Sequence, residues 1–149
     1  MSRPRVLLAD DHQIVTEGLK GLLEPEFELV GTVADGRAML AAAEKLRPDV
    51  IVADITMPLL NGIDAVRQIK QVHDEIKVVF LTMHPDVTYA VSAFEAGASG
   101  YVLTHSAPTE LVTAIRCALR GKTFVTPLLA GEFMQRTRER SDQRDGSTQ

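Results

Sequence analysis

Two stretches of the sequence decide the fold: Val6-Leu7-Leu8-Ala9-Asp10-Asp11 near its start and Val50-Ile51-Val52-Ala53-Asp54 further along. Each stretch is short, apolar and ends in carboxylates. Short apolar runs bounded by charge or proline are typical of strands buried on both faces of a parallel sheet. Two such strands that end at one edge of a sheet would bring Asp10, Asp11 and Asp54 together, where three anions repel one another unless a cation joins them. The sequence therefore predicts a divalent metal site at this edge.

Strand-like and helix-like stretches alternate along the chain. Proline and glycine separate them, as in Pro25 and Pro48, which follow the first two helical patterns. Strict alternation of this kind predicts an α/β domain with a parallel sheet covered on both faces. The predicted strands are 5–9, 27–33, 50–54, 77–81 and 100–103, and the predicted helices are 14–23, 39–46, 62–72, 87–96 and 108–119.

Length and composition limit the classes of function. The 149 residues, 45% of them apolar, suit one domain with a proper core, and a net charge of −4 argues against a surface that binds nucleic acid phosphates. The single cysteine, Cys117, excludes an internal disulfide and fits a reducing compartment. The N-terminus lacks the apolar core of a signal peptide, and no apolar run approaches about 18 residues, the length of a membrane span. We expect a cytoplasmic protein without a membrane partner.

The segment after residue 122 has a different character. Thr126-Pro127 followed by Leu128, Leu129, Phe133 and Met134 predicts one short helix. From residue 136 to 149 the chain has no large apolar side chain, so we expect a polar linker or frayed tail that cannot repay the entropy of ordering. The predicted domain organisation is a folded domain over 1–122 and a short helix with a polar tail over 123–149.

The predicted sheet edge carries hydroxyl groups as well as carboxylates. Ligand sites in open parallel sheets lie outside the carboxyl ends of the strands. Thr82 directly follows the fourth predicted strand, and Tyr101 and Thr104 lie at the fifth. A carboxylate beside Mg²⁺ can attack phosphorus and form an acyl phosphate, while the metal and hydrogen-bond donors neutralise charge on the transferred oxygens.

This assembly closely resembles the receiver domain of two-component response regulators, and most of all the NarL/FixJ (LuxR-type) family. The resemblance runs from about residue 5 to residue 121, and several motifs in the same order make it much more specific than any single motif. It implies a flavodoxin-like (βα)5 doubly wound fold with strand order 2-1-3-4-5. The matching motifs are Leu8-Ala9-Asp10-Asp11-His12, Asp54-Ile55-Thr56-Met57-Pro58-Leu59-Leu60-Asn61-Gly62, Leu81-Thr82-Met83-His84 and Ala96-Gly97-Ala98-Ser99-Gly100-Tyr101.

The resemblance also implies a role for each matching residue. Asp54 would accept a phosphoryl group from a sensor histidine kinase. Asp10 and Asp11 would hold Mg²⁺ together with Asp54 and the main-chain carbonyl of Thr56. Thr82 would bond a phosphoryl oxygen and swing inward. The remaining implied roles belong to Tyr101, the aromatic switch that changes the surface of the fourth helix, fifth strand and fifth helix, and to Pro58 and Gly62, which shape the loop after Asp54.

One position departs from the family pattern. Receiver domains carry a lysine at the end of the fifth strand, where this chain has Thr104. A threonine hydroxyl cannot replace the positive charge that lysine supplies to phosphoryl oxygens. Either Asp54 is phosphorylated with weakened coupling to the output, or the chain is an atypical, phosphorylation-independent receiver that acts as a dimerisation or docking module. His12, His84 and His105 lie near the site in the sequence, and neutral bystanders are the default for them.

The main prediction is a signalling receiver, not an enzyme, that controls transcription. In its relatives the output is a helix-turn-helix domain, for which the present chain has no room, so DNA would be bound only through an absent output domain. We also expect a homodimer. An enzyme with an Asp nucleophile, of the haloacid-dehalogenase type, would need an acid where Thr56 stands. A flavodoxin-like flavin carrier would need a phosphate-cradling loop where Asp10, Asp11 and His12 stand.

Overall fold

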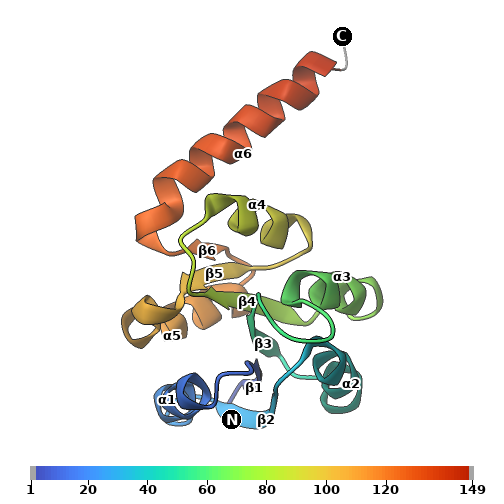
Figure 1. The fold of residues 1–149 in the computed structure, drawn as a ribbon, viewed down its shortest axis with the longest axis vertical. Helices are drawn as coiled ribbons and strands as arrows, with labels where there is room; N and C mark the ends of the chain where they lie inside the picture. The colour runs from blue at the N-terminus through green and yellow to red at the C-terminus, as the bar shows by residue number, and fades with distance from the viewer. Residues whose placement is uncertain (1–2, 148–149) are drawn as a thin grey trace.

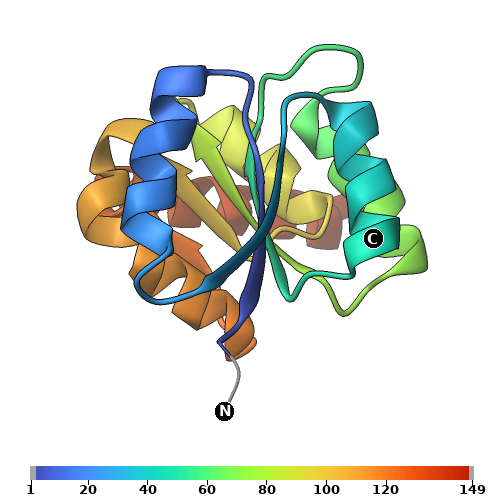
Figure 2. The ribbon, with the colours of Figure 1, turned by 90° about the horizontal axis from the view of Figure 1, so that it is seen from below.

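A computed structural model describes residues 3–147 of the chain, and side chains through residue 139. It is a parallel sheet with strand order β2-β1-β3-β4-β5-β6 and helices on both faces (Figures 1 and 2). The predicted order 2-1-3-4-5 is confirmed, with one added strand at the edge. The strands are β1 (Arg5–Ala9), β2 (Glu28–Val33), β3 (Val50–Asp54), β4 (Lys77–Thr82), β5 (Gly100–Leu103) and β6 (Phe124–Val125).

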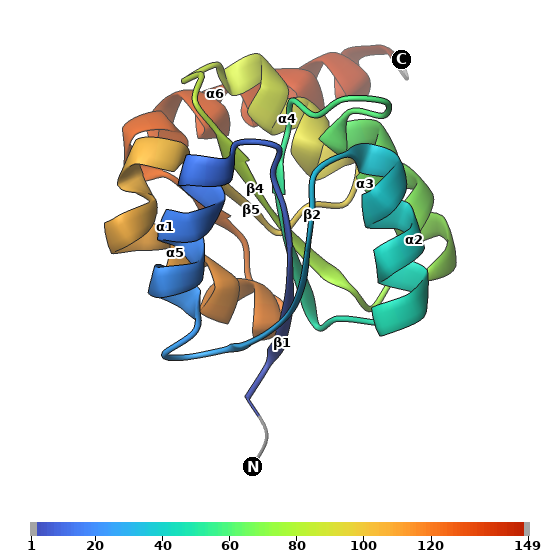
Figure 3. The same cartoon turned by 60° about the horizontal axis from the view of Figure 1, so that its bottom comes forward.

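Alternate residues of the central strands pack into two separate hydrophobic cores, one on each face of the sheet. Leu7, Ile51 and Phe80 pack on one face, and their strand neighbours pack on the other. The first face is covered by α2 (Gly36–Leu46), α3 (Gly62–Val72) and α4 (Val87–Glu95), and the second by α1 (Gln13–Leu23) and α5 (Ala107–Leu119) (Figure 3). Because both faces are buried, these strands are apolar throughout instead of alternating with polar residues.

Helix boundaries follow local signals closely. The predicted range 62–72 is the observed α3, and the other four predicted helices differ from the observed ones by a few residues at most. Three helices begin at an aspartate or asparagine whose side chain accepts a main-chain hydrogen bond: Asp35 for α2, Asn61 for α3 and Asp86 for α4. No helix in the described residues is both long and apolar enough to cross a membrane.

The segment after residue 122 corrects the sequence prediction. Phe124 and Val125 form β6, which pairs with Gly100 and Tyr101 of β5. A single helix, α6 (Pro127–Ser147), follows and extends beyond the body of the domain (Figure 1). The predicted polar tail is therefore helical as far as it is described, and its last two residues lie outside the described part of the chain.

The polar half of α6 has a physical reason to be helical. Starting a helix is costly, but extending one costs little, and Arg, Glu and Gln are good helix formers. The start of α6 is anchored, since Leu129 is only 4% exposed and the Thr126 hydroxyl donates to Glu110 Oε1 (2.9 Å) and accepts from the Leu103 N–H (2.9 Å). Composition alone suggested disorder because it does not show this anchor.

Candidate phosphoryl-acceptor site

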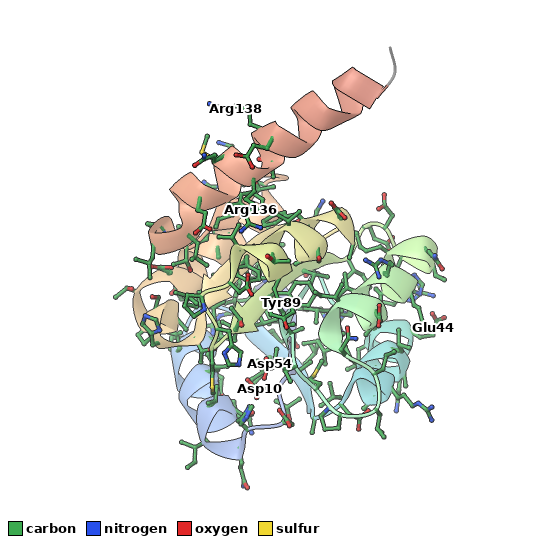
Figure 4. All side chains as sticks on the ribbon, turned by 45° about the horizontal axis from the view of Figure 1, so that its top comes forward. Asp10, Glu44, Asp54, Tyr89, Arg136 and Arg138 are labelled. Atoms are coloured by element: carbon green, nitrogen blue, oxygen red, sulfur yellow. The ribbon has the colours of Figure 1, made fainter. Side chains whose placement is uncertain are left out.

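The sheet register places the acidic residues at one edge. Ala9 of β1 pairs with Ala53 of β3, so Asp10 and Asp54 follow at the same level. The Asp10 N–H also donates to the Val33 carbonyl (3.0 Å), which ties the end of β1 to β2. Asp10 and Asp54 are 6% and 8% exposed, and Figure 4 shows them close together at the carboxyl edge of the sheet. The predicted convergence of these carboxylates is confirmed.

Asp10, Asp11, His12 and Asp54 form one compact group, in which a single ligand atom from each lies within 4.8 Å of the others. The His12 Nδ1 atom lies 3.0 Å from Asp10 Oδ1, 3.2 Å from Asp11 Oδ1 and 3.4 Å from Asp54 Oδ2. The main-chain N–H of His12 also donates to Asp10 Oδ1 (2.8 Å). Sequence reasoning treated His12 as a bystander. The position of His12 in the sequence motif does not reveal the orientation of its side chain, which brings the ring within reach of all three carboxylates.

The electrostatics of the group favour a cation. Burial, together with the charges of Asp10 and Asp11, raises the pKa of Asp54 to about 6, although the Thr56 N–H, which donates to Asp54 Oδ1 (3.1 Å), acts in the opposite direction. The hydrogen bond between the His12 ring and the accepting Asp10 carboxylate, together with the charges of the three carboxylates, raises the pKa of His12. Burial and the neighbouring charges both disfavour the ionised form of Asp54, and a bound cation would favour it.

The donor set fits a hard divalent ion. Carboxylate and carbonyl oxygens are the ligands that Mg²⁺ takes in proteins, and three carboxylates converge here. Among the side chains that the structure describes, no lysine or arginine forms an ion pair with these carboxylates, so histidine is their partner there. The Thr56 main-chain N–H contacts Asp54, and the role of its carbonyl as a metal ligand stays a prediction.

The loop after Asp54 needs a glycine at its end. A Cβ on Gly62 would lie 2.5 Å from the Asp54 carbonyl oxygen, closer than real Cβ atoms approach, and 3.1 Å from the Phe80 ring, a tight contact. The Gly62 N–H donates to the Ile55 carbonyl (2.8 Å) and closes the loop. Within it Leu59 has a φ of 69°, in the left-handed region. Gly62 thus lets the chain return against the backbone of Asp54.

Thr82 and Tyr101 lie on β4 and β5, the two strands that follow β3 in the sheet. Thr82 follows Leu81, which pairs with Asp54, and it is 3% exposed. Its hydroxyl oxygen accepts from the His84 N–H (3.1 Å) and contacts the His84 carbonyl at 3.4 Å. Tyr101 is fully buried, and its hydroxyl donates to the Asp86 carbonyl (3.3 Å) at the start of α4. Burial raises the pKa of Tyr101 to about 12, so this hydroxyl keeps its proton and acts as a donor.

Thr104 directly follows β5, whose last residue, Leu103, pairs with Thr82. It begins a short 3-10 helix, η1 (Thr104–Ser106), and lines an apolar groove of about 470 Å³ between α1 and the start of α5. Ile14 and Pro108 line the same groove. The departure from the family pattern therefore places a short hydroxyl side chain, and no cation, at this position.

Comparisons with known proteins agree with this geometry. The family model of the response regulator receiver domain matches residues 6–116 of this chain. The transcriptional regulatory protein DegU of Brevibacillus brevis is 35% identical over 136 residues, which are 90% of this chain and 58% of that protein. The transcriptional regulatory protein LiaR of Bacillus subtilis (strain 168) is 38% identical over 136 residues, 90% of this chain and 64% of that protein.

A solved structure agrees as well. The LuxR-family two-component response regulator from Aurantimonas sp. SI85-9A1 superposes with a TM-score of 0.86 at 39% identity, covering 91% of this chain and 99% of that one. The chain spans about three fifths of the length of DegU and LiaR. These relatives are regulators of transcription, which does not favour the alternative of a phosphorylation-independent docking module. The chain belongs to the response regulator receiver domain family, of the type found in LuxR- and NarL-family regulators.

Proposed function

We propose that Asp54 is phosphorylated, with Mg²⁺, by a sensor histidine kinase, and that this controls transcription. The observation that carries the proposal is the burial of Asp54 beside Asp10 and Asp11 at the carboxyl edge of the sheet. A nearly buried carboxylate among like charges is a costly arrangement for structure alone, and such arrangements concentrate at functional sites.

The transfer would proceed by direct displacement at phosphorus. A carboxylate oxygen of Asp54 attacks the phosphorus of a phosphohistidine, the phosphorus–nitrogen bond breaks, and its electron pair returns to the donor imidazole. The product is an acyl phosphate on Asp54. Bound Mg²⁺, held by Asp10, Asp11, Asp54 and the Thr56 carbonyl, would supply charge neutralisation on the transferred oxygens.

Neighbouring groups of the chain prepare this step. The Thr56 N–H donates to Asp54 Oδ1, which leaves Oδ2, on the side of His12 and Asp10, to attack. Thr82 follows the residue paired with Asp54 and would donate to a phosphoryl oxygen in the product. Thr104 supplies no charge to the product, so we expect phosphorylation to shift the output surface less than it would with lysine.

The partners follow from the relatives. DegU and LiaR are transcriptional regulatory proteins longer than this chain. We therefore propose that the receiver acts in the cytoplasm on an output domain that binds DNA, and that it forms a homodimer. The net charge of −4 argues against DNA binding by this chain alone.

Incubation with Mg²⁺ and acetyl phosphate tests the proposal. Intact-mass spectrometry should show one phosphate adduct that requires Mg²⁺ and is absent from Asp54→Ala. Asp74→Ala is the matched control, since Asp74 carries the same carboxylate but its side chain is 95% exposed and it lies in the loop after α3. No adduct on a folded wild-type chain, or an unchanged adduct on Asp54→Ala, would overturn the proposal.

A further inference from the structure

The side chain of His12 does not cap the helix that it precedes. His12 is the N-cap residue of α1, yet its side chain makes no capping hydrogen bond. In contrast, the N-cap side chains of α2, α3 and α4 each accept a main-chain hydrogen bond. Histidine is also not among the residues that N-cap positions favour. The ring of His12 lies against the acidic group instead.

The main chain holds His12 in this place. Its N–H donates to Asp10 Oδ1 (2.8 Å), and its carbonyl accepts from the N–H (2.9 Å) and the hydroxyl (3.0 Å) of Thr16. One main-chain group of His12 is thus bonded to a carboxylate of the site and the other to the first turn of α1. A ligand whose backbone is fixed in this way loses less conformational entropy when it binds an ion.

The distances around His12 Nδ1 match the spacing of ligands that share one metal ion. Two atoms that each lie about 2.1 Å from an ion are about 3.0 Å apart on adjacent corners of an octahedron and about 3.4 Å apart on a tetrahedron. Nδ1 lies 3.0 Å from Asp10 Oδ1, 3.2 Å from Asp11 Oδ1 and 3.4 Å from Asp54 Oδ2. The nitrogen and the carboxylate oxygens can therefore bind the same ion with little movement.

We propose that His12 Nδ1 is a further ligand of the ion held by the three carboxylates, and that it makes the site favour a divalent first-row transition ion over Mg²⁺. The inference concerns the metal site of the proposed function and rests on it. Imidazole nitrogen is a good ligand for Zn²⁺ and Ni²⁺, whereas Mg²⁺ takes oxygen. Carboxylate oxygens bind both kinds of ion, so the nitrogen is the ligand that distinguishes between them.

The competing account treats the ring as an internal positive charge that neutralises the carboxylates and is displaced by an ion. Its side chain is 48% exposed, so water screens much of such a charge. A single N–H donates well to one acceptor, whereas three carboxylates lie within 3.4 Å of the one nitrogen. This convergence suits a shared ion better than a hydrogen bond. Removal of a displaceable charge would raise the affinity for every divalent ion, which is opposite to the effect of removing a ligand.

Calorimetric titration of the full, untagged chain with Ni²⁺ and with Mg²⁺, in separate runs without a phosphodonor, tests the ligand. His12→Asn replaces the ring nitrogen with an amide and keeps a residue that N-caps favour. We expect its affinity for Ni²⁺ to fall by about tenfold to a hundredfold relative to its affinity for Mg²⁺. His105→Asn is the matched control, because His105 is exposed, lies in η1 and is not a member of the acidic group.

X-ray absorption at the nickel edge identifies the ligand directly. The chain is loaded with less Ni²⁺ than protein, and the ring atoms of a coordinated imidazole then give outer-shell scattering that carboxylates do not give. This scattering should be present in the wild type and in His105→Asn and absent from His12→Asn. Circular dichroism checks that each variant is folded.

The outcomes separate this inference from the proposed function. Absence of imidazole scattering from the wild type, or an unchanged ratio of Ni²⁺ to Mg²⁺ affinity in His12→Asn, overturns the nitrogen ligand. A rise in the affinity of His12→Asn for both ions overturns it in favour of the internal charge. Neither measurement uses a phosphodonor, so failure of the wild type to form the Mg²⁺-dependent adduct on Asp54 overturns the proposed function and is scored separately.

Discussion

Asp54→Asn tests the electrostatics of the site, because asparagine removes the charge but keeps the shape and an acceptor for the Thr56 N–H. Burial raises the pKa of Asp54 from 3.8 to about 6. One pKa unit corresponds to about 1.4 kcal/mol, so the ionised carboxylate costs the folded state about 3 kcal/mol. This cost should be absent from the variant.

The sign of the pH dependence follows from proton binding. Between a pH near 4 and a pH near 6, the folded chain still holds a proton on Asp54 that the unfolded chain has released. The contribution of this group to stability therefore falls as pH rises through that window. We expect the variant and the wild type to be about equally stable near the lower limit. At about pH 7.5 the variant should be more stable by about 3 kcal/mol, or roughly 10 °C in Tm.

Urea denaturation followed by circular dichroism measures this difference, since the chain has no tryptophan. The solutions contain a chelator, because a divalent cation would stabilise only the ionised carboxylate. Asp74→Asn is the control: its side chain is 95% exposed, and we expect a change within about 0.5 kcal/mol. Equal stability of Asp54→Asn and wild type at about pH 7.5, or a difference that does not shrink on acidification, would refute the reasoning.

Three further predictions concern the metal, the missing cation and the loop glycine. Mg²⁺ should raise the Tm of the wild type, since a ligand of the folded state stabilises it, and Asp10→Asn should abolish most of this gain; an unchanged gain contradicts the assigned ligands. Phosphorylated Thr104→Lys should show a larger change in hydrogen exchange of α4 than phosphorylated wild type, because lysine adds a charge for the phosphoryl group, and no gain would count against that role. Gly62→Ala should lower the free energy of unfolding in urea by about 2 to 3 kcal/mol because of the close contacts of its Cβ, whereas Gly21→Ala, where a Cβ meets nothing within 4 Å, should raise it by up to about 1 kcal/mol.

The central strands and the acidic edge could be predicted because their signals are local. An apolar run such as 50–54 is buried on both faces whichever helix covers it, and the parallel order then brings Asp10 and Asp54 to one edge. The carboxylates converge because each follows a parallel strand at its carboxyl end, and the sequence alone shows that each comes directly after an apolar run.

The remaining features depend on contacts between distant segments. The polar half of α6 is helical because Leu129 and Phe133 anchor its start, and composition does not reveal that anchor. The contacts of the His12 ring and of the Tyr101 hydroxyl depend on side-chain orientation, which periodicity does not specify. The two residues of β6 are too few for a periodic signal, and their pairing with β5 is decided by the fold.

Identifying the phosphorylated residue tests the central claim most directly. The chain is treated with acetyl phosphate and Mg²⁺, reduced with borohydride, which converts an aspartyl phosphate to homoserine, and digested for peptide sequencing by mass spectrometry. The account predicts homoserine at position 54 and at no other aspartate. Homoserine at position 10 or 11, or a phosphate recovered only on histidine or on a hydroxyl side chain, would contradict it.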